Sequence, residues 1–167
     1  KQNVLYILAN RYFKLNDIYE VRDQKVKYAK AVLTGASKQA AIEAAELEKD
    51  ATLYRCHFEF PASLSLYIND KQIDAIKDGM TYNSLQVQYE SLVDMVPSLT
   101  EEEKKQIYAW YKEAREFSMD AENSDKKHAA FNKYKGRINN YLTKRGYDLV
   151  KERNEWYKRL KAAGKKI

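Results

Sequence analysis

The chain has 167 residues, the length of one ordinary domain, and nearly half of them are Ala, Glu, Lys, Leu or Arg. With only 5 Gly and 2 Pro, this composition is typical of long packed helices and excludes a turn-rich β-sandwich or barrel, while 44% apolar residues exclude a disordered chain. The net charge of +6 is unevenly spread, with −5 over residues 1–125 and +11 over residues 126–167. Such a basic segment indicates a surface for an anionic partner, and the alternative is that its lysines lie on the solvent face of the last helices.

Two long helices are predicted at the start of the chain. Residues 4–34 and residues 38–60 each carry an apolar seam with heptad spacing, and Gly35 and Ser37 are suited to end the first helix and cap the second. The second seam contains small residues that let two helices approach closely, which indicates an antiparallel hairpin. Pro61 predicts a kink or an end of the second helix. The second seam consists of Ala40, Ala44, Leu47, Ala51, Tyr54 and Phe58.

Shorter helices follow. Asn69 with Gln72, and Thr100 with Glu103, both resemble a capping box, in which side chain and backbone bond reciprocally. The predicted helices cover approximately residues 69–79, 85–96, 100–120, 125–144 and 148–163. No alternating strand pattern is present. The sequence therefore predicts an all-α fold, a multi-helical bundle built on the long N-terminal hairpin, in a single domain over residues 1–167.

The sequence gives little support for a metal site, a disulfide or a membrane-spanning segment. The single Cys56 excludes an internal disulfide and a Cys-based zinc site. Acidic residues follow Asp120, but an EF-hand loop that starts there would need Gly at Asp125 and Glu at Phe131. We expect no metal or cofactor, and no apolar run is long enough to cross a membrane.

Catalytic patterns are also lacking. The chain has no Gly-x-Ser-x-Gly elbow, no phosphate-binding Gly loop and no His-Glu-x-x-His motif. Carboxylates one turn apart, such as Glu113 and Glu116, could serve acid–base chemistry, but such pairs are common on solvated helix faces. The pattern favours a protein without catalytic activity.

The predicted helix over 125–144 carries the most informative stretch. Tyr134, Ile138 and Tyr141 form an apolar stripe, and Arg137 and Asn140 lie beside it. We expect at least one of these two polar side chains to line a concave surface next to an aromatic ring. The alternative is that the aromatic residues are core and the polar residues are solvated.

The glycine in the middle of this helix supports the first reading. Gly136 costs a helix about 1 kcal/mol relative to Ala, so it predicts the close approach of another element or a ligand. Ten of the 21 aromatic residues lie between Tyr108 and Tyr157. An aromatic-lined cleft with Arg and Asn would suit a carbohydrate.

Two arginines occupy apolar seam positions. Arg22 and Arg153 must each find a carboxylate or a pocket, because a guanidinium at a core position is costly without a partner. Ion pairs to residues such as Asp23 or Asp120 are one option, and a site that faces a ligand is the other.

Several longer blocks resemble one known family. They are Lys77–Tyr82, Pro97–Glu102, Ala114–Ala121 and Lys133–Leu142, with Leu15–Ile18 and Gly146–Leu149 fitting as well. The chain resembles, over nearly its whole length, a bacterial family that is catalogued as a domain of unknown function and whose description suggests sugar binding. A weaker similarity, at Leu99–Glu103 and Ile68–Gln72, is to periplasmic helical stress chaperones.

The first resemblance implies a secreted or periplasmic helical domain made with a signal peptide, in agreement with a start at Lys1 in place of Met. It assigns no catalytic residue. The sugar-binding description places candidate ligand-binding residues on the matching polar and aromatic positions. These are Asp78, Tyr82, Arg115, Asp120, Lys135, Arg137, Asn139 and Asn140.

Three functions remain open from the sequence. The first is a secreted carbohydrate-binding or accessory protein. The second is binding of nucleic acid or another polyanion through the basic C-terminal helices, for which a secretory signal would argue against nucleic acid. The third is a periplasmic chaperone-like role.

Overall fold

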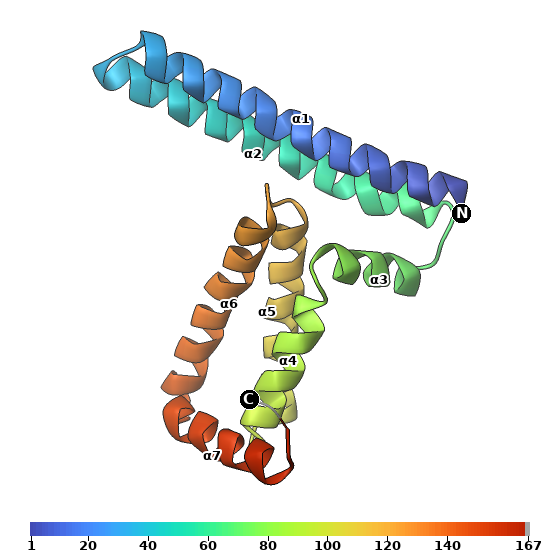
Figure 1. The fold of residues 1–167 in the computed structure, drawn as a ribbon, viewed down its shortest axis with the longest axis vertical. Coiled ribbons are helices and arrows are strands. Elements are labelled where there is room, and N and C mark those ends of the chain that lie inside the picture. Colours follow the sequence, from blue (N-terminus) through green and yellow to red (C-terminus); the bar gives the residue numbers. More distant parts are fainter. Residues whose placement is uncertain (166–167) are drawn as a thin grey trace. The chain divides into compact units, whose positions relative to one another are not determined.

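The computed structural model describes residues 1–165, which form seven α-helices and no strand (Figure 1). The all-α prediction is confirmed, and each predicted helix overlaps an observed one. The helices are α1 Gln2–Val32, α2 Gly35–Ser65, α3 Asp70–Met80, α4 Ser84–Met95, α5 Glu101–Met119, α6 Ser124–Lys144 and α7 Leu149–Ala162.

Tertiary contacts divide the chain into two compact units. The first is Lys1–Ala75 and the second begins at Ile76, so the boundary falls inside α3. The single domain predicted over residues 1–167, of which 166 and 167 lie outside the described residues, stays a prediction. Compact units in a structure can still unfold together as one cooperative domain.

The first unit is built on an antiparallel hairpin of α1 and α2, as the sequence predicts (Figure 1). Arg11 Nη1 donates a hydrogen bond of 3.0 Å to the carbonyl oxygen of Cys56. Arg22 forms the structural ion pairs that the sequence offered as one option, at 3.2 Å to Glu46 and 2.6 Å to Asp23. The hairpin interface therefore contains buried and half-buried guanidinium groups as well as apolar side chains.

The face that α2 buries differs from the predicted seam. All six residues of that seam (Ala40, Ala44, Leu47, Ala51, Tyr54 and Phe58, here called the outer stripe) are exposed. The buried residues of α2 are Ala45, Leu53, Phe60 and Leu64. Both sets repeat at helical spacing, and the buried set holds the larger side chains along most of its length, which fill more space between helices than alanines do.

The ends of the second helix also differ from the prediction. Gly35, with a φ of +54°, begins α2, and its N-cap is Thr34 and not Ser37. Pro61 lies within α2, which continues through Ser65. A proline removes only one backbone donor, which a long helix packed against a neighbour can tolerate near its end.

Both predicted capping boxes are present. The backbone N–H of Gln72 donates to Asn69 Oδ1 at 3.0 Å, and the backbone N–H of Asn69 donates to Gln72 Oε1 at 3.1 Å. Thr100 and Glu103 exchange the same two bonds at 3.2 and 2.9 Å. These local signals therefore set the starts of α3 and α5.

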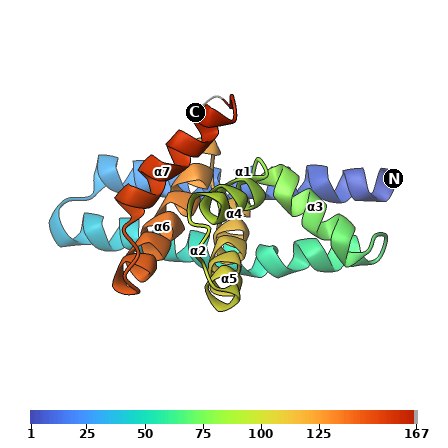
Figure 2. The same cartoon turned by 90° about the horizontal axis from the view of Figure 1, so that it is seen from below.

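The second unit holds most of the buried apolar residues. In it α5 packs against α4 and α6, and α7 contacts both α4 and α6. Figure 2 views α4, α5 and α6 roughly end-on, with α7 crossing them. The core of this unit includes Leu85, Leu92, Val96, Ile107, Tyr111, Phe131, Ile138 and Leu142. Because α7 lies across α4 and α6, the three helices can enclose a cleft beside this core.

Candidate functional site

A cleft of about 340 Å³ opens between α4, α5, α6 and α7, entirely within the second unit. Its apolar wall includes Leu92 from α4 and Leu149 from the start of α7. Its polar lining residues are Gln88, Ser91, Lys135, Asn139 and Arg153. This volume is in the range of small-molecule sites, and its mixed lining is typical of them.

Two aromatic side chains of α7 form one side of the cleft. The rings of Trp156 and Tyr157 stack with centroids 5.7 Å apart and planes at 28°. Trp156 Nε1 donates a 2.6 Å hydrogen bond to Asp94 Oδ2, and Arg159 Nη2 donates to the carbonyl oxygen of Asp94 at 2.8 Å. These bonds fasten α7 to the end of α4, and they hold the indole ring in one orientation at the cleft.

One polar group of the cleft is buried without a partner: Gln88 Oε1 accepts no hydrogen bond within the described chain. The side chains of Lys135 and Arg153 are exposed to solvent, and neither they nor the Asn139 side chain form a hydrogen bond or ion pair with a described residue. A buried oxygen without a donor carries a desolvation cost that a hydroxyl or amide of a ligand can offset.

The tyrosine in the cleft wall is neutral. Tyr111 is only 2% exposed, and burial raises its pKa to about 12. Its phenol therefore keeps its proton at physiological pH. Tyr111 belongs to the buried core behind the cleft, and it does not supply a base.

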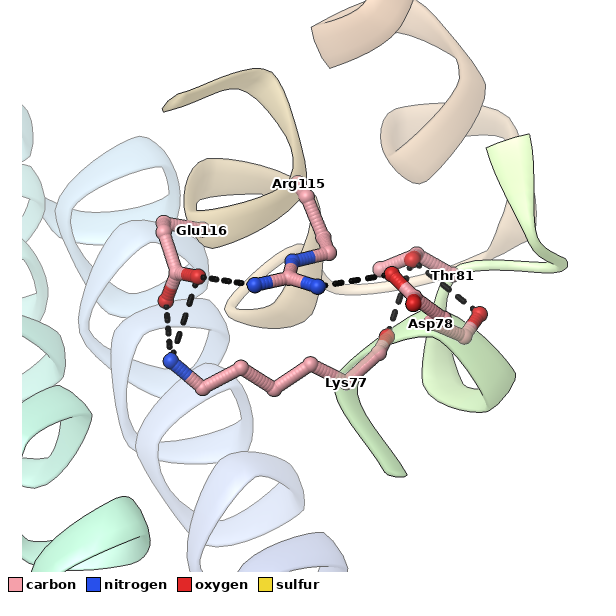
Figure 3. A network of polar contacts seen from close by, with 5 residues as sticks. All are labelled: Lys77, Asp78, Thr81, Arg115 and Glu116. Carbon is pink, nitrogen blue, oxygen red and sulfur yellow. Dashed lines mark hydrogen bonds and ion pairs between the residues drawn. The ribbon is translucent and has the colours of Figure 1, made fainter. Parts of the chain in front are cut away.

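A second group of predicted site residues forms a charged network around Arg115 (Figure 3). Arg115 is 2% exposed and lies 2.7 Å from Asp78 and 3.2 Å from Glu116. Lys77 completes the chain of charges with a 2.9 Å ion pair to Glu116. Each charge in this network has an opposite partner, so the network ties the end of α3 to α5.

The turn that follows this network contains Tyr82. Tyr82 and Asn83 have φ values of 59° and 54°, a left-handed conformation that side chains with a Cβ seldom adopt. The Tyr82 ring stacks on His128, with centroids 5.3 Å apart, and Lys127 Nζ donates at 2.8 Å to the carbonyl oxygen of Met80. These contacts hold the turn against α6.

The structure therefore separates the eight predicted site residues. Lys135 and Asn139 line the cleft, while Asp78 and Arg115 belong to the charged network. Tyr82 lies in the adjoining turn and Asp120 is the C-cap of α5. Arg137 and Asn140 are both exposed and lie outside the cleft lining.

Arg137 contacts aromatic rings on a different face of α6. Its guanidinium lies 4.9 Å from the ring centroid of Tyr134 and 6.0 Å from that of Trp110, and 3.5 Å from Glu113. A Cβ built on Gly136 meets nothing within 4 Å, so the predicted close approach of another element is wrong among the described residues. The cleft uses the flank of Lys135 and Asn139 because α7 packs on that side.

Several residues that line the cleft could not be identified from the sequence. Gln88 and Ser91 on α4, and Tyr157 on α7, carried no signal beyond helical spacing. Arg153 did carry one, because a cation at a seam position must find a pocket or a partner. The structure places it in the cleft lining as an exposed side chain, and not at the core position that the seam predicted.

Within residues 1–165, no group of three or more His, Cys, Asp or Glu side chains is arranged to hold a metal ion. No described helix is long and apolar enough to span a membrane.

Comparison with known proteins identifies a family. A family described as "Protein of unknown function (DUF3826)" matches residues 1–162, which is nearly the whole chain. None of the curated proteins matches it.

Proposed function

The chain belongs to the DUF3826 family of proteins of unknown function, and from the geometry of the cleft we propose that it is a non-catalytic carbohydrate-binding or accessory protein. The observation that carries this proposal is the cleft in which Trp156 and Tyr157 lie beside polar groups that have no partners. Sugars offer C–H faces that pack on aromatic rings, and hydroxyl groups that donate to and accept from amides.

The lining divides these tasks among its residues. Trp156, held by Asp94, supports the C–H face of a sugar ring. Gln88 Oε1 accepts from a hydroxyl, and Asn139 both donates and accepts. An aromatic surface on one helix and amides on two others would fix both the plane and the rotation of a bound ring.

The same lining argues against glycoside hydrolysis. Most glycosidases use two carboxyl groups that flank the scissile bond. The described residues that line this cleft include no Asp or Glu. The proposal is therefore one of binding without cleavage.

Calorimetric titration with a panel of oligosaccharides tests this proposal, with Asn139→Ala and Trp156→Ala as the cleft variants. We expect saccharide binding by the unaltered protein and a loss of affinity of about tenfold or more in each variant. Arg137→Ala is the matched control, since Arg137 is an exposed residue of the same helix outside the cleft. Melting temperatures accompany each titration, because Trp156→Ala also removes the bond to Asp94.

An absence of binding across the panel at millimolar ligand would contradict the proposal. Equal losses of saccharide affinity in Asn139→Ala and Arg137→Ala would also contradict it. Suppression of the aggregation of an unfolded client without saccharide binding would favour the chaperone-like role instead.

We also propose that the protein acts outside the cytoplasm, as a secreted or periplasmic protein. Resemblance to the bacterial sugar-binding description supports this location, and extracellular glycans are reached only there. Fractionation of cells that express the tagged full-length gene product tests it. Recovery in the cytoplasmic fraction alone would contradict this location.

A further inference from the structure

Two cations on different helices line the cleft. Lys135 from α6 and Arg153 from α7 both line it, and the described lining residues include no carboxylate. Neither cation forms an ion pair with a described residue. Elsewhere in this unit, Arg115 lies 2.7 Å from Asp78 and Arg145 lies 2.6 Å from Glu103.

This lining favours an anionic ligand group. Lys135 and Arg153 are exposed and hydrated, and a carboxylate that enters the cleft gains two charge-assisted donors without competition from a carboxylate of the lining. A guanidinium also binds a carboxylate through two parallel hydrogen bonds. Lys135 and Arg153 belong to different helices, so one anionic group between them would bridge α6 and α7.

The remaining lining limits which anion fits. Gln88 Oε1 needs a hydrogen-bond donor, and the rings of Trp156 and Tyr157 favour a flat apolar face. A bare phosphate or sulfate offers no apolar face. A sugar acid supplies hydroxyl donors, a C–H face and a negative charge in one ring.

We propose that the cleft recognises acidic saccharides, with the carboxylate of a uronic acid residue held by Lys135 and Arg153. This inference rests on the proposed carbohydrate-binding function and names its substrate class. Lys135 and Arg153 provide the selectivity for charge, and Trp156, Gln88 and Asn139 bind the sugar ring.

The test compares an oligogalacturonate with its methyl ester, which has the same ring and no charge. We expect calorimetry to show the acid binding at least tenfold more tightly than the ester. Arg153→Gln and Lys135→Gln should each reduce that ratio several-fold. Lys133→Gln is the matched control, an exposed lysine of α6 outside the cleft lining, and should leave it unchanged.

The outcomes separate this inference from the proposed function. Equal affinity for acid and ester would overturn the acidic specificity and leave carbohydrate binding in place. Binding of neutral oligosaccharides alone would do the same. No binding of any saccharide would overturn both, and a DNA oligonucleotide bound more tightly than the oligogalacturonate would identify a general polyanion site.

A second inference comes from the outer stripe of α2, independently of the cleft. Its three large residues are well exposed, with Leu47 at 62%, Tyr54 at 69% and Phe58 at 57%. Tyr54 and Phe58 pack edge to face with centroids 5.1 Å apart. An exposed apolar face of this kind, opposite the face that packs on α1, marks an interaction surface.

The order of side chains along the stripe fits a second copy of the chain. Ala40 and Ala44 at its start are small, Leu47 and Ala51 follow, and Tyr54 and Phe58 at its end are large. Antiparallel pairing of two copies about Ala51 lays Phe58 of each copy on Ala44 of the other and Tyr54 near the other copy's Leu47. Such a self-complementary patch is the requirement for a two-fold symmetric interface.

Charges beside the stripe agree with the same pairing. Glu48, which also forms an ion pair with Lys25 of α1, and Arg55 lie two turns apart on one flank. Antiparallel pairing about Ala51 brings Arg55 opposite the partner's Glu48 and repeats this contact by symmetry. We infer that α2 forms an isologous homodimer interface.

Sedimentation across a concentration series tests this interface with the full chain. We expect a monomer–dimer equilibrium for the unaltered protein and a monomer for Ala51→Glu, because two new carboxylates would meet at the symmetry axis. Ala109→Glu, on an exposed site of α5, is the matched control and should dimerise normally. Circular dichroism checks that both variants keep their helix content.

A charge exchange adds a second readout. Arg55→Glu should weaken the dimer several-fold, and adding Glu48→Arg should restore it. A monomer at all concentrations would overturn the inference, as would a dimer that Ala51→Glu does not affect.

Discussion

At the scale of single residues, the buried charged side chains of this protein stabilise the folded state. Glu103 is 2% exposed, and it accepts hydrogen bonds from Tyr147 at 2.7 Å and Arg145 at 2.6 Å as well as from the backbone N–H of Thr100. Burial alone would raise its pKa. The three donors outweigh burial and lower the pKa from 4.5 to about 2.

The pH dependence of stability follows from this shift. Because the folded pKa lies below the ordinary value, Glu103 stabilises the fold fully above about pH 4.5 and loses this effect as the pH falls toward 2. We expect Glu103→Gln to lower the free energy of unfolding at pH 7 by roughly 2 kcal/mol. Urea titrations between pH 2 and 7 should show a flatter pH profile for the variant. Parallel profiles would contradict the role assigned to Glu103.

Arg115 gives a second prediction at this scale. Arg115→Met leaves the carboxylates of Asp78 and Glu116 without their central cation, and should cost roughly 3–5 kcal/mol of unfolding free energy. Arg137→Met is the control, because its half-exposed pair with Glu113 at 3.5 Å should contribute less than about 1 kcal/mol. Chemical denaturation measures both. Equal losses would show that the buried network is no more important than a surface pair.

At the scale of single helices, α6 shows how spacing defines a stripe without defining its neighbours. Tyr134 and Ile138 are buried, as their spacing predicts. The flank with Lys135 and Asn139 borders the cleft, whereas Arg137 packs on aromatic rings elsewhere. The choice between the two flanks depends on where α7 lies.

The glycine of α6 yields a prediction at this scale. Gly136 is exposed, has ordinary helical backbone geometry and leaves open space for a Cβ. Gly136→Ala should therefore stabilise the protein by about 0.5–1 kcal/mol. Gly146→Ala is the opposing control. Gly146 has a φ of +94°, which a residue with a Cβ seldom adopts, so this variant should lose about 1 kcal/mol of unfolding free energy. Thermal melts measure whether each variant gains or loses stability. A loss of stability in Gly136→Ala would indicate that another group does approach this glycine closely.

At the scale of the whole molecule, the two units differ in how much apolar surface they bury. Of the twenty buried apolar residues among those described, seven precede Ile76, whereas twelve of the eighteen exposed large apolar residues do. Burial of apolar surface is the main favourable term in folding. The hairpin of α1 and α2 is therefore the less stabilised part of the monomer.

Hydrogen exchange tests this difference. At low protein concentration, we expect backbone amides of α1 and α2 to exchange faster than those in the middle of α5 and α6. At high concentration, protection along α2 should rise if two copies pair through the outer stripe. Equal protection in both units at every concentration would indicate one cooperative domain, as the sequence predicts, without a contribution from dimerisation.

The sequence by itself determined the helices of this protein and the starts of two of them. Capping boxes such as Thr100 with Glu103 act over three residues, and a helical stripe repeats within each turn, so both are local properties. They could be predicted without knowing what any helix touches.

Tertiary structure alone decided which stripe each helix buries and which side chains meet in the cleft. Two faces of α2 have helical apolar spacing, and the face with Leu53 and Phe60 packs while the outer stripe stays exposed. Gln88 and Trp156 are far apart in sequence, and they line one cleft because α7 packs across α4 and α6. Spacing fixes the direction of a side chain around its own helix, and only packing between helices fixes what lies opposite it.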